Sequence, residues 1–104
     1  MDQQVAVRIY WEYDDASAIF ANVQIFVNQI QLNGGNSRVL GNIPAHHFYR
    51  ALLEWFKIHG LATADTPHLL SEALRIDRIH RVGEFQYADI LVVANMSSLL
   101  AQQV

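Results

Sequence analysis

A short stretch near the start of the chain alternates so regularly that it constrains the fold more than any other feature. Over residues 5–13, VAVRIYWEY, the odd positions from Val5 to Tyr13 are all apolar or aromatic, whereas Arg8 and Glu12 are among the even positions. A period of two residues is typical of a strand with one buried and one exposed face. We therefore expect a sheet whose buried face is covered by a second layer of structure.

Composition agrees with a single packed domain. The chain has 104 residues, 52% of them hydrophobic and 11% aromatic, which is enough for one core and too short for two domains. We expect residues 1–104 to form one globular domain. Because the chain contains no cysteine, it has no disulfide, no cysteine-ligated zinc and no thiol nucleophile.

Residues 16–32 fit two patterns at once. As a helix, they place Ala16, Ile19, Val23 and Ile30 on one stripe; as a strand, they alternate from Ile19 to Val27. The length of the segment and the break in alternation at Asn28 favour the helix. We therefore predict a long helix here, with a strand as the alternative.

The middle of the chain combines turn-forming and helix-forming signals. Residues 33–44 are rich in Gly and Asn, which predicts a loop or a short hairpin tip. A second long amphipathic helix is expected to follow Pro44 and to end at Gly60, and a short helix is expected from Thr66 to about Leu74.

The last third of the chain favours strands. Residues 74–82 alternate imperfectly, whereas residues 85–94 end in an apolar run that is typical of a buried strand. The predicted fold class is therefore α+β: an N-terminal strand, two long amphipathic helices, a short helix and one or two C-terminal strands. An all-helical fold is the alternative if both of these segments prove helical.

No pattern of residues in the chain matches a catalytic or metal-binding motif. The histidines show no zinc-binding spacing, and Arg50 lies among the polar side chains of the second long helix, where its charge would repel a bound dication. We predict no catalytic residue, no metal and no cofactor. The alternative is a small-molecule-binding or acid–base enzyme domain with a pocket formed by His47, Tyr49 and Glu54.

A small arginine patch stands out in a chain whose net charge is −3. Arg75, Arg78 and Arg81 are close in sequence, but Asp77 lies among them and no aromatic-rich RNA-binding motif accompanies them. We therefore expect the patch to bind a protein partner and not a nucleic acid.

Aromatic side chains on both faces of the first strand complete the functional prediction. Tyr10, Trp11 and Tyr13 supply more apolar area than a small one-sided sheet readily buries, and tyrosine, tryptophan and arginine are enriched in interface hot spots. We predict a non-catalytic interaction or regulatory module that forms a homodimer and binds a protein partner through these aromatic faces and the arginine patch. We expect it to be cytoplasmic and not membrane-bound, because no signal-peptide pattern and no spanning apolar run is present.

Overall fold

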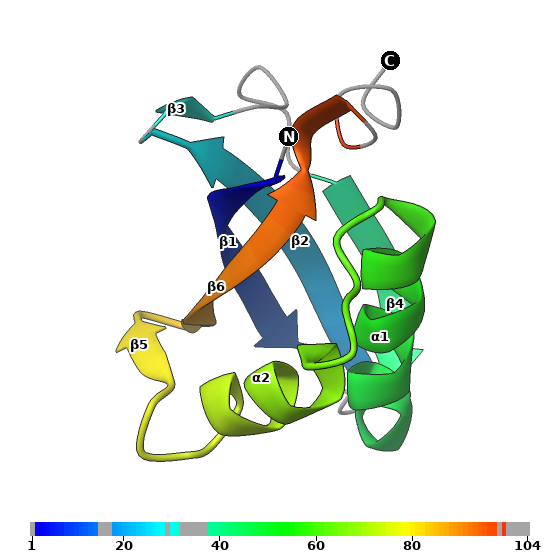
Figure 1. Cartoon of the computed structure of the whole chain (residues 1–104). Helices are drawn as coiled ribbons and strands as arrows, with labels where there is room; N and C mark the ends of the chain where they lie inside the picture. Colours follow the sequence, from blue (N-terminus) through cyan, green and yellow to red (C-terminus); the bar gives the residue numbers. More distant parts are fainter. Residues whose placement is uncertain (1, 15–17, 29, 32–37, 98, 100–104) are drawn as a thin grey trace.

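The computed structural model describes residues 2–14, 18–28, 30–31, 38–97 and 99. It has the α+β class that the sequence predicts (Figure 1). The elements in chain order are β1 (Asp2–Tyr13), β2 (Ala18–Val27), β3 (Ile30–Gln31), β4 (Arg38–Pro44), the 3-10 turn η1 (Ala45–His47), α1 (Phe48–Ile58), α2 (Thr66–Ala73), β5 (His80–Val82) and β6 (Phe85–Asn95).

The strands form one antiparallel sheet in the order β3-β2-β1-β6-β5, and β4 also pairs with β2. The central strand β1 pairs with β2 from Ala6 to Tyr13 and with β6 from Asp2 to Trp11. The short strand β5 pairs only with the first three residues of β6. Strands β1 and β6, which are far apart in the sequence, therefore lie side by side in the middle of the sheet.

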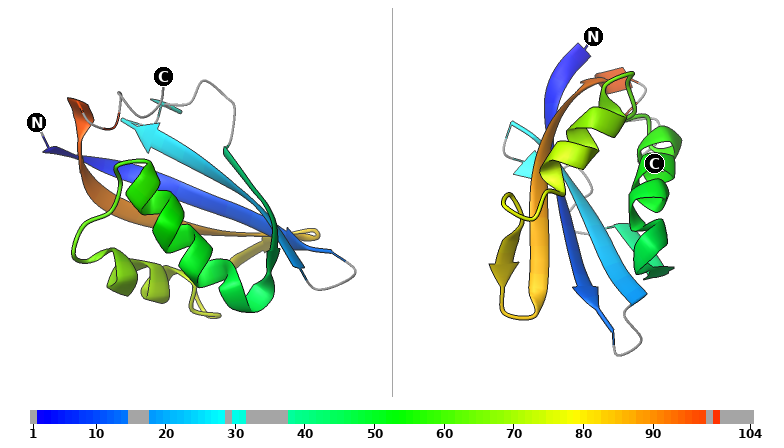
Figure 2. Two further views of the ribbon diagram at one scale, coloured as in Figure 1. Left: turned by 90° about the vertical axis from the view of Figure 1, so that its right-hand side faces the viewer. Right: turned by 90° about the horizontal axis from the view of Figure 1, so that it is seen from below.

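Both helices cover the same face of the sheet (Figure 2). The core between them contains alternate residues of the three long strands, together with Leu52 and Phe56 of α1 and Leu70 of α2, all fully buried. Alternation places every second side chain of β1, β2 and β6 in this core and sends the others to the opposite face of the sheet. No helix in the described part of the chain covers that opposite face.

The predicted N-terminal strand is confirmed and extends over the whole of β1. The side chains of Val5, Val7, Ile9 and Trp11 are buried, as the alternation predicts. Tyr13, at the end of the strand, is half exposed. The expected buried strand over 85–94 is also present, as β6.

The predicted long helix over 16–32 is wrong: the described part of this segment forms β2 and β3. The odd positions of β2 from Ile19 to Ile25 are buried on the side of the helices, whereas Phe20 and Phe26 lie on the opposite face of the sheet. Asp14 accepts a hydrogen bond from the Ala18 amide at 2.9 Å at the β1–β2 connection. Pairing with β1 therefore overrides the helical pattern.

The expected loop over 33–44 is also partly wrong. Residues 33–37 lie outside the described part of the chain, and Arg38–Pro44 forms β4 on the edge of β2. The register between these two strands shifts between Ala21 and Asn22, where β4 carries an extra residue. Gly41 accommodates this bulge with a φ of +85°.

The two helices expected after Pro44 are confirmed. α1 has 11 residues and is followed by Gly60 with a φ of +71°, whereas α2 has 8 residues and begins at Thr66 with Pro67 in its first turn. The structure therefore has one of the two expected long helices and the expected short helix. Within 74–82, only His80–Val82 is a strand.

Candidate interaction surface

The uncovered side of the sheet is the main candidate for a functional surface, and we call it the open face. Because successive side chains of a strand point to opposite sides, its members follow from the register and burial of the strands. They are Gln4, Ala6, Arg8, Tyr10 and Glu12 of β1, Phe20, Asn22, Gln24 and Phe26 of β2, His80 and Val82 of β5, and Phe85, Tyr87, Asp89, Leu91 and Val93 of β6.

Large apolar side chains are exposed at both ends of the open face. Of the nine exposed large hydrophobic residues among the described ones, five belong to it, which gives the molecule an asymmetric distribution of exposed apolar area. The exposed fractions of these five are 39% for Phe20, 60% for Val82, 49% for Phe85, 56% for Leu91 and 53% for Val93. An apolar patch of this kind on an otherwise well-packed domain is typical of an interaction site.

A shallow hollow lies at one end of the open face. Ala6 of β1 has Phe26 of β2 as its neighbour on one side and Leu91 of β6 on the other. The hollow has a volume of about 940 Å³, and its lining includes these three residues together with Gln4 and Arg8. Because alanine is much smaller than either neighbour, the centre of this apolar row is lower than its sides.

A neutralised ion pair occupies the middle of the open face. Arg8 donates two hydrogen bonds to Asp89, from Nε to Oδ1 at 2.6 Å and from Nη2 to Oδ2 at 2.9 Å. Its Nη1 lies 3.5 Å from the Tyr10 hydroxyl, and these hydrogen bonds, chiefly the one with Asp89, raise the pKa of Arg8 above its usual value. The guanidinium is therefore permanently charged and already paired.

Aromatic rings form a row beside this ion pair. The ring of Tyr87 on β6 lies 5.6 Å from that of Tyr10 on β1 and stacks on that of His80 on β5 at 4.7 Å. The guanidinium carbon of Arg8 lies 4.5 Å from the centre of the Tyr87 ring, within the range of a cation–π contact. These contacts hold the polar centre of the open face in a defined arrangement.

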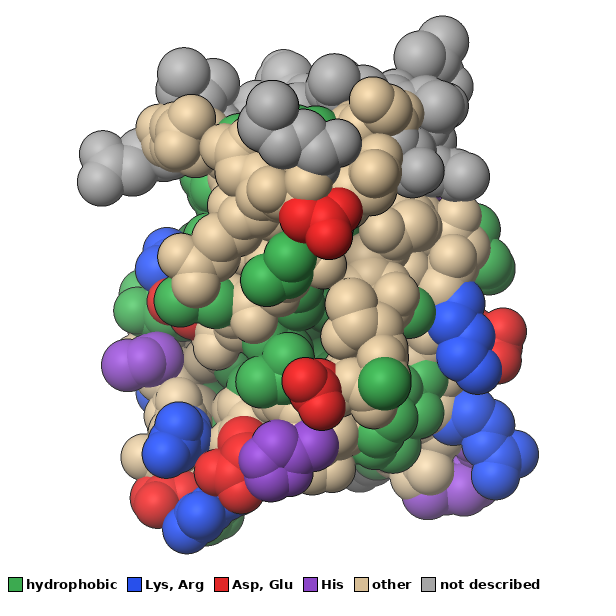
Figure 3. All heavy atoms as spheres, viewed as in Figure 1, with side chains coloured by type: hydrophobic (Ala, Val, Ile, Leu, Met, Phe, Trp, Pro, Cys, Tyr) green, Lys and Arg blue, Asp and Glu red, His purple; other side chains and the backbone are tan. Residues whose placement is uncertain are grey.

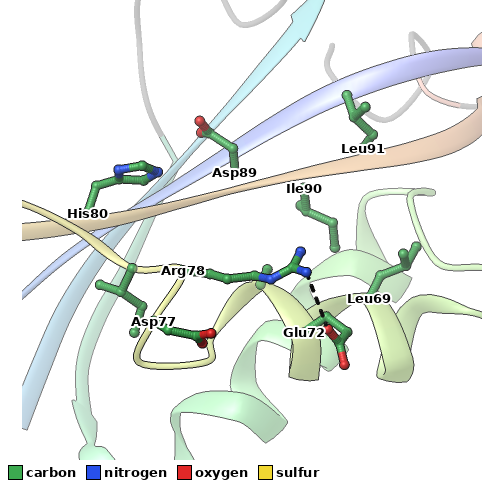
Figure 4. Close-up of a pocket in the computed structure, with 10 residues that line it drawn as sticks. Leu69, Glu72, Asp77, Arg78, His80, Asp89, Ile90 and Leu91 are labelled. Carbon is green, nitrogen blue, oxygen red and sulfur yellow. Dashed lines mark ion pairs between the residues drawn. The ribbon is translucent and has the colours of Figure 1, made fainter.

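A second hollow, of about 610 Å³, lies where α2 and its connection to β5 meet β6 (Figure 4). Ile90 lines it from the side of β6 that faces the helices, whereas Asp89 and Leu91 lie on the opposite side of that strand. The Arg78 guanidinium spans part of it and pairs with Glu72 at 3.9 Å. The opposite charges of Arg78 and Glu72 in this hollow therefore compensate each other.

Comparisons with known proteins leave the geometry as the only guide to function. No family model, curated protein or solved structure matches the chain.

Among the described residues, no group of three or more His, Asp or Glu side chains is placed to hold a metal ion. In the same part of the chain, no helix is long and apolar enough to span a bilayer.

The predicted aromatic partner-binding residues do not share one face. Tyr10 lies on the open face, whereas Trp11 is in the core, where it is 2% exposed and its ring lies 5.4 Å from that of Phe48. Tyr13 is 50% exposed at the end of β1. Of the three, Tyr10 is therefore the one that contributes to the candidate surface.

The predicted arginine patch lies around the α2–β5 connection, where charged side chains gather at the lower left of Figure 3. Arg75 is 3.7 Å from Glu72 and 3.3 Å from Asp77, and Arg78 shares Glu72. Arg81 follows on β5, on the opposite side of that strand from His80 and Val82. Acidic partners thus compensate part of the positive charge of the patch.

The three residues of the predicted pocket are all exposed. Tyr49 donates a hydrogen bond to the carbonyl oxygen of Pro67 on α2 at 3.0 Å, and Glu54 is 3.8 Å from the ammonium of Lys57. His47 precedes α1 and contacts the ring of His46. Neither of the two hollows described above includes any of the three.

Sequence reasoning missed the residues that give the open face its character, chiefly Ala6, Leu91 and Val93. In the sequence, Leu91 and Val93 alternate with Ile90 and Val92, so the whole run resembles a strand buried on both sides. The signal that could have found them is the pairing of β1 with β6, because it places Leu91 beside Ala6 and Asp89 beside Arg8.

Proposed function

We propose that this protein is a non-catalytic interaction module and that its open face binds the surface of a protein. One observation carries the proposal: five large apolar side chains are exposed on the side of the sheet that no described helix covers, two at one end of the open face and three at the other. Burying such a surface against a partner is favourable by roughly 25 cal/mol per Å² of apolar area. The central ion pair and the aromatic row would determine how the two surfaces align.

The predicted arginine patch and the predicted pocket support the proposal less. Arg75 and Arg78 already have acidic partners, so a second acidic surface would have to compete with these contacts. His47, Tyr49 and Glu54 are exposed, and Tyr49 and Glu54 have hydrogen-bond or ion-pair partners of their own. An acid–base function at these residues therefore has weaker support than an interaction through the sheet.

Partner capture with matched surface variants tests this function. The face variant carries Leu91→Glu and Val93→Glu, and the control carries Ile58→Glu and Ile76→Glu, which introduce the same charges at exposed apolar residues away from the open face. We expect the face variant to lose the proteins that the wild-type protein retains from native lysate, and the control to keep them. Equal capture by both variants would contradict the proposal, provided that circular dichroism shows both to be folded.

A further inference from the structure

We infer that the partner of the open face is a second copy of this chain, packed face to face about a two-fold axis that runs parallel to β1 and β6 and between them. This inference rests on the proposed function and names the occupant of the same surface. It follows from the register of β1 and β6, whose open-face residues lie directly opposite each other. An axis between the strands exchanges the two positions of each pair.

The exchange makes the open face complementary to itself in shape. Leu91, which is 56% exposed, is the register partner of Ala6, at the centre of the hollow. The proposed axis therefore places Leu91 of each copy over Ala6 of the other. A projecting side chain and the recess that receives it are both present on every copy, as a symmetric interface requires.

The same axis makes the charges complementary. Asp89 is the register partner of Arg8, so each guanidinium would lie over the carboxylate of the other copy while keeping its own. In the next row, Tyr10 of one copy would lie over Tyr87 of the other. Because Arg8 and Asp89 cancel within each copy, the centres of the two faces can approach without net repulsion.

The area of the face suits a dimer of moderate affinity. From Gln4 to Glu12 the face extends about 27 Å along β1, its three long strands span about 14 Å across, and the three-residue β5 widens one end, which gives about 430 Å² per copy. Two copies would bury about 900 Å², the size of a weak or transient interface, and aligned packing of two sheets is a common arrangement. We therefore expect self-association in the micromolar range.

Sedimentation equilibrium provides the first test. The wild-type mass should rise from 11.8 kDa toward twice that value between low micromolar and several hundred micromolar concentrations. Leu91→Glu should weaken the association at least tenfold, because it replaces the apolar contact of Leu91 with Ala6 of the other copy by a buried carboxylate, and Ile58→Glu should leave it unchanged. A dimer that tolerates Leu91→Glu would overturn the proposed interface.

An exchange of charges tests the axis itself. The double variant Arg8→Asp/Asp89→Arg restores the ion pairs within each copy and between two identical copies, so it should associate with itself. Mixed with tagged wild-type protein it should form no mixed dimers, because like charges would then face each other at both positions. Mixed dimers in statistical proportion, or a double variant that fails to associate with itself, would contradict the axis.

The two proposals can fail separately. The wild-type protein could stay monomeric at every concentration while the Leu91→Glu/Val93→Glu variant fails to capture the proteins that the wild-type protein captures. In that case the open face binds a different protein, and only the proposed self-association is wrong. If the mass and the captured proteins are both insensitive to the face variant, the open face is not the interaction site, and both proposals fail.

Discussion

Arg8 and Asp89 form a two-point hydrogen-bonded ion pair across β1 and β6, although 81 residues separate them in the chain. Their side chains remain 36% and 49% exposed, so water competes with the contact and salt screens it. The pair therefore contributes more to the arrangement of the open face than to the stability of the fold.

A double-mutant cycle measures this contribution. Arg8→Gln, Asp89→Asn and the combined variant should show a coupling free energy below about 1 kcal/mol, because exposed ion pairs typically contribute that little. The free energy of unfolding is obtained from urea titrations at low protein concentration, where self-association is negligible. A coupling of several kcal/mol would contradict the exposed character of the pair.

The pH dependence that arises from Arg8 has a defined sign. Its pKa is raised in the folded protein, chiefly by the hydrogen bond with Asp89, so its stabilising effect is complete below the pKa of a free guanidinium and is lost only as the pH rises through the folded-state value. The difference in unfolding free energy between the wild-type protein and Arg8→Gln should therefore stay constant from neutral to mildly alkaline pH. A steady decline over that range would contradict this assignment.

The bulge in β4 depends on the backbone of Gly41. A Cβ at this position would meet no atom within 4 Å, but the φ of +85° is strained for any residue with a side chain. Gly41→Ala should lower the free energy of unfolding by about 1–2 kcal/mol, whereas Asn42→Ala, at the exposed neighbouring position, should change it little. Urea titration of the two variants provides the comparison, and equal effects would contradict a backbone origin.

Asn22 carries a buried polar atom without a partner. Its Oδ1 is the one buried side-chain oxygen or nitrogen of the described residues that makes no hydrogen bond. Asn22→Leu should raise the free energy of unfolding by about 1 kcal/mol, because an unsatisfied buried acceptor is destabilising. Gln24→Leu, on the same side of β2, serves as the control, and a loss of stability specific to Asn22→Leu would show that the amide has a structural role.

The arginine patch should not influence self-association. Arg75 and Arg78 lie in the α2–β5 connection, and Arg81 points away from the open face. The variant with all three arginines replaced by alanine should therefore have the dissociation constant of the wild-type protein by sedimentation equilibrium. A clear change in the dissociation constant would show that the interface includes this connection. It would also support the sequence-based prediction that the patch binds a partner.

The sequence predicted β1 and α1 because the buried positions of each recur with a single period. It predicted β6 from a continuous apolar run, although β6 has apolar side chains on both faces. β2 is different, because Phe20 and Phe26 add apolar side chains to its second face and so complete a helical stripe with Ile19 and Val23. The apolar open face is thus the physical reason why this strand resembles a helix.

The candidate surface was less predictable, because it depends on contacts between distant strands. Tyr10 was identified from its residue type, but the hollow at Ala6 requires Phe26 and Leu91 as neighbours, and no local pattern reveals that pairing. β4 was missed for a related reason: Gly41 and Pro44 are typical of loops, and only pairing with β2 makes this segment a strand.

The position of β1 in the sheet has a consequence for folding during synthesis on the ribosome. β1 is synthesised well before β6, which ends at Asn95, yet β6 is one of the two neighbours of β1 in the sheet. Until that strand emerges, the nascent β1–β2 hairpin has an unpaired edge and no complete core, and such intermediates are prone to aggregate. Folding of the complete sheet must therefore wait until β6 has been translated.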